Sequence, residues 1–120
     1  MRRMLWWSLL LLSLPVVALA DKADVVGVAI KERGNGLFQL DVTIAHKDEG
    51  WEHYVDHWEV LDADGKVIAT RTLFHPHTGE ATFTRSLVGL KLPPSLQEVT
   101  VRAHCSVDGF GGKSMTVKVH

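Results

Sequence analysis

The pattern that most constrains this chain is an alternation of apolar and polar residues near its C-terminal end. In residues 96–119, LQEVTVRAHCSVDGFGGKSMTVKV, apolar side chains recur at every second position from Val99 to Val107. A repeat of two residues indicates a β-strand with one buried face. Asp108–Lys113 contains three glycines, and the alternation resumes at Met115. We therefore expect a β-hairpin in which Cys105 and Val107 share the inner face with Val99.

The first 20 residues have the organisation of a secretory signal peptide. Two arginines at positions 2 and 3 precede an apolar run over residues 4–14, and Ala18-Leu19-Ala20 supplies the small residues of a cleavage site. The run is shorter than the roughly 20 residues that span a bilayer. We expect cleavage after Ala20 and export to the periplasm or the medium, with no membrane span in the mature form. An uncleaved anchor is the alternative. Because residue 21 is Asp and not Cys, we expect no lipid anchor at the mature end.

The remaining segment, residues 21–120, has the length of one domain with a single core. Two of the 13 basic residues fall in the signal peptide, whereas all 14 acidic residues follow it, so the mature chain carries a formal charge of −3. It shows neither a basic run nor a basic face, which argues against binding to nucleic acid or to an anionic membrane surface. We expect a monomer.

Cys105 is the single cysteine of the chain, so no internal disulfide can form. Its position in the alternation matches that of Val101 and Ala103, which predicts that the thiol points inward. We interpret it as a buried, unreactive thiol, with a reactive or metal-binding thiol as the alternative.

Turn signals divide the rest of the mature chain into short segments with the same alternation. Gly34-Asn35-Gly36 and Asp62-Ala63-Asp64-Gly65 are typical turn sequences. In the first segment Val26, Val28 and Ile30 occupy every second position, which predicts that they share one face. In the third segment, Trp58 is the expected central ring of the core. We expect strands near residues 26–30, 38–44, 54–61, 66–74 and 83–90, in addition to the hairpin. Seven strands in about 100 residues, with no segment of helical periodicity, predict an all-β, antiparallel two-sheet sandwich.

Two sets of residues resemble known proteins. Leu87-Val88-Gly89-Leu90, Pro93, the alternation from Val99 to Ala103 and Val55-x-x-Trp58-x-Val60 resemble strands of fibronectin type III domains. This resemblance implies a fibronectin type III or immunoglobulin-like sandwich. Phe74-His75-Pro76-His77, with Phe83-Thr84-Arg85-Ser86-Leu87, resembles small exported bacterial proteins of unassigned function. That second resemblance implies export and no particular chemistry.

Strand order predicts which loops meet. If successive strands run in opposite directions, the loops at residues 46–53, 75–82 and 108–113 share one end of the sandwich. Four of the seven histidines then lie at this end, which we call the histidine pole: His46, His53, His75 and His77. Loops held by a rigid scaffold are common places for binding sites.

The sequence His75-Pro76-His77 is the candidate metal-binding motif at this pole. Pro76 favours extended backbone, which allows two imidazoles two residues apart to face one ion. His46, His53 or Glu80 would supply a further ligand. In an exported protein, imidazole ligands suit Zn²⁺ or Cu²⁺. The alternative is that these histidines are ordinary loop residues or hydrogen-bond partners.

Two other groups are candidates for binding. Trp51, Tyr54 and Phe110, with Glu80 nearby, form a candidate recognition surface, or else the aromatic rings cap the end of the core. His57 and His104 have outward phase on strands that we expect to be neighbours. With Glu59 and Arg102 they would form a polar patch or, as we favour, a cross-strand ladder.

The sequence favours a non-enzymatic function, because no nucleophile motif or catalytic spacing is present. The first hypothesis is an exported interaction module that binds an unknown protein or envelope component and needs no cofactor. The second hypothesis is a periplasmic protein that binds Cu or Zn through the loop containing His75 and His77.

Overall fold

The computed structural model describes residues 22–120, and the predicted signal peptide therefore lies outside the described residues. The described residues form seven strands and no helix. The strands, in chain order, are β1 (Asp24–Glu32), β2 (Leu37–Ala45), β3 (Val55–Leu61), β4 (Val67–Thr72), β5 (Thr82–Lys91), β6 (Glu98–Cys105) and β7 (Met115–Lys118). Within residues 22–120 no apolar helix has the length that a membrane crossing needs.

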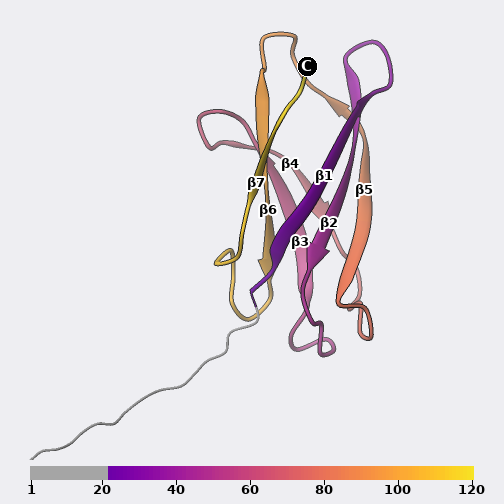
Figure 1. Ribbon diagram of the computed structural model, residues 1–120, viewed down its shortest axis with the longest axis vertical. Helices are drawn as coiled ribbons and strands as arrows, with labels where there is room; N and C mark the ends of the chain where they lie inside the picture. The colour runs from indigo at the N-terminus through magenta and orange to yellow at the C-terminus, as the bar shows by residue number, and fades with distance from the viewer. Residues whose placement is uncertain (1–21) are drawn as a thin grey trace, which may run out of the picture.

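The strands form two antiparallel sheets, one of three strands in the order β1-β2-β5 and one of four in the order β4-β3-β6-β7 (Figure 1). The predicted all-β architecture with two antiparallel sheets is therefore confirmed. The chain passes between the sheets at three connections: from β2 to β3, from β4 to β5 and from β5 to β6. The predicted C-terminal hairpin is present as β6 and β7, which pair from Glu98↔Lys118 to Val101↔Met115.

One apolar core joins the two sheets. Its fully buried side chains come from β2 in one sheet and from β3 and β6 in the other, and Trp58 is the largest of them. The alternation on β2 is regular, with Phe38, Leu40, Val42 and Ile44 all buried. Trp58 Nε1 has no hydrogen-bond partner among the described residues, so this ring contributes through apolar packing.

Two residues depart from the predicted alternation. Val26 was expected to share a face with Val28 and Ile30, but a register shift between Val25 and Gly27 buries Val25 and leaves Val26 48% exposed. Such a β-bulge adds one residue to the strand and reverses the faces beyond it. Val107 was expected to continue the inner face of β6. It is 62% exposed, because β6 ends at Cys105 and the chain turns back so that Cys105 bridges Gly109.

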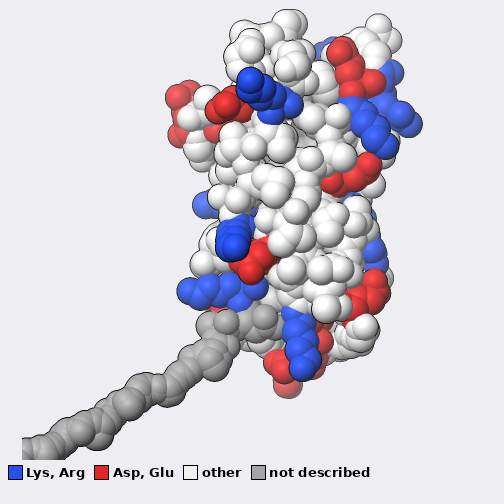
Figure 2. Space-filling view, viewed as in Figure 1, with Lys and Arg blue, Asp and Glu red and all other residues white. Residues whose placement is uncertain are grey.

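The three predicted loops meet at one end of the structure. The His46 N–H donates to the Ala81 carbonyl over 3.0 Å, and the Ser106 N–H donates to the Tyr54 carbonyl over 2.9 Å. The histidine pole therefore exists, at the lower end of the strands in Figure 1. On the face shown in Figure 2, basic and acidic side chains are interspersed, and this face carries no single-sign patch.

Replacing Trp58 with Ala should lower the free energy of unfolding by about 3–5 kcal/mol, because it empties the largest buried site in the core. Trp58→Phe should cost less than about 2 kcal/mol, since a ring remains and an N–H without a partner is removed. Chemical denaturation of both variants measures the difference. A Trp58→Ala midpoint close to that of the parent would contradict the central place of this ring.

Candidate functional site

The carboxylate of Asp48, in the loop between β2 and β3, organises the histidine pole. It is buried, and its Oδ1 lies 2.5 Å from His46 Nδ1 and accepts the Val55 N–H over 3.2 Å. Its Oδ2 accepts the backbone N–H of His77 over 2.7 Å. One buried charge therefore joins the β2–β3 loop to the β4–β5 loop, and these contacts offset the cost of removing it from water.

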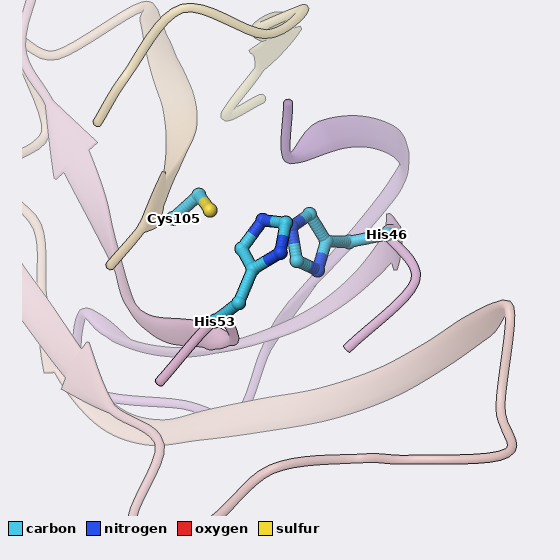
Figure 3. A group of neighbouring side chains, drawn as sticks. All are labelled: His46, His53 and Cys105. Carbon is cyan, nitrogen blue, oxygen red and sulfur yellow. The ribbon is translucent and has the colours of Figure 1, made fainter. Parts of the chain in front are cut away.

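Three side chains converge beside this carboxylate. His46 follows β2, His53 precedes β3, and Cys105 ends β6, so one residue comes from each of three strand ends (Figure 3). Each offers a ligand atom, and these atoms all lie within 4.8 Å of one another. The two imidazole rings are nearly perpendicular, with their centroids 5.1 Å apart. His46 and Cys105 are buried and His53 is half-buried, so the group lies just beneath the surface of the pole.

Carboxylates orient both imidazoles. His46 Nδ1 contacts Asp48 Oδ1 at 2.5 Å, and His53 Nδ1 contacts Glu49 Oε1 at 2.7 Å. A carboxylate accepts a hydrogen bond from the ring nitrogen that it faces, so that nitrogen carries the proton and the lone pair of a neutral imidazole lies on Nε2. Histidine ligands of metals commonly have this arrangement, in which an outer carboxylate fixes the tautomer and the ring orientation.

Asp108 supplies an oxygen donor near two atoms of the group, His53 Nε2 and Cys105 Sγ. Its Oδ2 lies 3.6 Å from His53 Nε2 and 3.9 Å from Cys105 Sγ. Ligands around a tetrahedral zinc ion, at the usual bond lengths, are separated by roughly 3.3–3.6 Å. The two imidazoles, the thiol and this carboxylate are therefore close enough to reach one small cation if the group draws together on binding it.

His75 and His77 occupy different surroundings. The His77 ring is buried and stacks on Phe83, with centroids 4.0 Å apart and an angle of 9° between the planes. His75 is exposed, and its ring lies 5.3 Å from that of His77. Among residues 22–120, two groups of three potential ligands lie within 4.8 Å, and neither contains His75 or His77. Of the four predicted metal ligands, the structure therefore brings His46 and His53 together and adds Cys105.

Burial holds the pKa of His77 below its ordinary value, and the nearby positive charge of Arg85 acts in the same direction. Asp48 opposes this shift, since its carboxylate lies 3.4 Å from His77 Nδ1, whereas His75 adds a small further lowering. The neutral ring is thus the stable form against Phe83. His77 therefore serves the packing of the pole.

Cys105 is buried, as its inward position in the alternation predicted, but its place at the histidine pole was not predicted. The missed signal is its position. Cys105 is the last residue of β6, three residues before Asp108, where the loop assigned to this end of the structure was predicted to begin. A residue that points inward and stands at the end of a strand next to the pole lies both in the core and at the pole, as Cys105 does.

The predicted aromatic surface is divided. Trp51 is 67% exposed and meets the Tyr54 ring edge-on, with centroids 5.7 Å apart. Phe110 packs on the outer face of the four-stranded sheet, against His104 at 4.7 Å. Glu80 is exposed and lines a cavity of about 410 Å³ with Lys47, Asp48, Gly79 and Ala81.

Together these features define an all-β protein with a candidate transition-metal centre at one end of its two sheets. No protein-family model matches the chain, and no solved structure matches it. The chain is similar to a protein of Halomicrobium mukohataei described as "Putative lipoprotein", with 35% identity over 96 residues. The match covers 80% of this chain and 47% of that protein, so the chain spans about half the length of its relative.

Asp48→Asn should lower the free energy of unfolding by about 1–3 kcal/mol, because an amide cannot accept from every donor that faces the carboxylate. Glu49→Gln is the matched control. Its side chain is 59% exposed, and the change should stay within about 0.5 kcal/mol. Equal losses in the two variants, measured by denaturation, would contradict the organising role of Asp48.

The stability of the metal-free protein should fall as the pH drops below 6.5, the ordinary pKa of histidine. The pKa of His77 is lowered by folding, so the unfolded chain binds the proton more readily and stability is lost through this window. The contribution of one such group is at most about 1.4 kcal/mol per pH unit. His77→Phe keeps a ring against Phe83 and should reduce the slope, whereas the exposed control His75→Ala should not. Parallel pH profiles for the parent and His77→Phe would refute this assignment.

Proposed function

We propose that this protein is an exported, non-enzymatic β-sandwich of the fibronectin type III kind that binds one transition-metal ion at its histidine pole. The order of three and four strands in the two antiparallel sheets supports the sandwich type. The leader pattern in residues 1–20 supports export, as does similarity to a protein named as a lipoprotein. A metal centre would also give a role to the convergence of His46, His53 and Cys105.

The convergence of His46, His53 and Cys105 carries the proposal. Imidazole and thiolate are the ligands that Zn²⁺ and Cu ions prefer, whereas Mg²⁺ and Ca²⁺ prefer oxygen. Three nearby carboxylates, Asp48, Glu49 and Asp108, add negative charge that favours a cation. The chemistry of the donor set therefore selects a copper or zinc ion.

The burial of the group favours a closed, structural or storage site. The His46 and Asp48 side chains have no exposed area, and Cys105 is likewise inaccessible. A catalytic metal keeps an open position for substrate, but here Asp108 stands beside the exposed side of the group. The ion would tie together the loops that follow β2 and β6. Such a tie would supply the cross-link that a chain with one cysteine cannot obtain from a disulfide.

A second candidate function is the interaction module. Trp51 is 67% exposed and Phe74 is 76% exposed, on the loops before β3 and after β4. Exposed aromatic rings are typical anchors of protein interfaces. An envelope protein that binds these loops is the partner that this observation favours.

Zn²⁺ should raise the stability of the chelator-treated parent by about 2.7 kcal/mol at a free concentration 100 times the dissociation constant. Cys105→Ser should remove most of this gain, because the thiolate is lost as a ligand. His75→Ala is the control, since His75 lies outside the proposed ligand set, and it should retain the gain. Cu²⁺ should in addition give a thiolate charge-transfer absorption in the parent that is absent from Cys105→Ser.

Three outcomes would count against this site. If Zn²⁺ stabilises Cys105→Ser as much as the parent, the thiol is not a ligand. If His75→Ala loses the gain and Cys105→Ser keeps it, the ion binds at the loop containing His75 and His77. If no variant responds to either metal, the interaction module becomes the better proposal.

A further inference from the structure

A second group of potential metal ligands lies on the outer face of the four-stranded sheet. Asp56 and His57 belong to β3, and His104 lies opposite His57 on β6. Their ligand atoms lie within 4.8 Å of one another. We propose that these three residues form a second metal site, which binds a divalent transition-metal ion in an open position on the sheet surface.

A β-bulge places two adjacent ligands on one face. The register of β3 against β6 shifts between Val55 and His57, so the regular alternation of side chains is interrupted there. Val55 and Trp58 are both buried, and the two residues between them are both half-buried. Asp56 is two residues before Trp58, so regular alternation would place both on the inner face. Because of the bulge, Asp56 instead lies on the outer face beside His57.

Both imidazoles point to the same atom. Asp56 Oδ1 lies 2.9 Å from His57 Nδ1 and 2.7 Å from His104 Nδ1. The two rings are stacked, with centroids 4.6 Å apart and an angle of 21° between their planes. A metal ion would replace the two ring protons that now face Asp56: with each imidazole in the tautomer that carries its proton on Nε2, the two Nδ1 lone pairs and a carboxylate oxygen can meet at one ion after a small movement of the Asp56 side chain. The set of two histidines and one carboxylate is a common ligand set for divalent transition metals.

Neighbouring side chains hold the two rings in place. Phe110 meets the edge of both, with centroids 5.6 Å from His57 and 4.7 Å from His104. The Arg102 guanidinium lies 4.0 Å above Phe110 and pairs with Glu59 at 2.8 Å. The rings are therefore fixed by packing before a metal arrives, which lowers the entropic cost of binding.

This site differs from the pole in being open. The side chains of Asp56, His57 and His104 are 29%, 25% and 27% exposed. Asp56 and His57 also line a cavity of about 400 Å³, whose wall includes Tyr54, Thr72 and Phe74. Coordination positions that the three residues leave unfilled would face this space, where water or a small donor molecule can complete them. Because His104 and Cys105 are consecutive on β6, the two sites lie on opposite faces of one strand.

Equilibrium dialysis of the full exported chain against Zn²⁺ or Cu²⁺ tests the proposal by counting ions per chain. In the double variant His57→Gln and His104→Gln the count should fall by one, whether or not the pole binds its own ion. Either single variant should weaken the binding of that ion by more than about tenfold, at least the effect of losing an outer partner of a ligand. His75→Gln, which removes an exposed histidine outside both groups, should leave the count unchanged.

Copper resonance spectra identify the ligands. In Cys105→Ser the remaining Cu²⁺ signal should show two coupled imidazole nitrogens, and Asp56→Asn should alter it. An unchanged ion count in the His57/His104 double variant, with its circular dichroism intact, would overturn the proposal and leave a cross-strand ladder. Should Cys105→Ser fail to fold, the count in the parent and in the double variant still decides.

Discussion

The structure of the histidine pole depends on the buried carboxylate of Asp48. Its two oxygens face His46 Nδ1 and the backbone N–H groups of Val55 and His77, so three segments are held by one residue. A buried charge is tolerated only where donors surround it, and here those donors are backbone and ring N–H groups that would otherwise be buried without partners. The orientation of His46, and with it the candidate ligand set, follows from this contact.

The two candidate sites show how one strand pair can support different chemistry. The inner face of β6 contributes Cys105 to a buried group, and its outer face contributes His104 to an open one. The alternation of side chains separates the thiol from the exposed ligands. The thiol of Cys105, a soft ligand, is thus kept in the interior, whereas the imidazoles of His57 and His104 and the carboxylate of Asp56 lie at the surface. The fold accordingly places one buried and one half-exposed group of potential ligands within a few residues.

Much of this arrangement could be predicted from periodicity. Strand positions, the shared pole, the approach of His46 to His53 and the pairing of His57 with His104 all follow from alternation and strand order. The β-bulges could not be predicted in this way. They reverse the faces of Val26 and Asp56, because one inserted residue shifts every position beyond it. The spacing of three between Val55 and Trp58, both buried, is the trace that the second bulge leaves in the sequence.

The complete burial of Cys105 also has a consequence for how the chain matures. In an oxidising compartment an accessible thiol forms mixed disulfides with other molecules, and an unfolded chain exposes the thiol that the native structure hides. If the chain is exported, as proposed, folding would therefore compete with oxidation, and a chain that folds slowly would be captured as a covalent adduct. Burial in the native fold protects the Cys105 thiol from oxidation. The fraction of chains found as mixed disulfides would therefore measure the fraction that was oxidised before folding was complete.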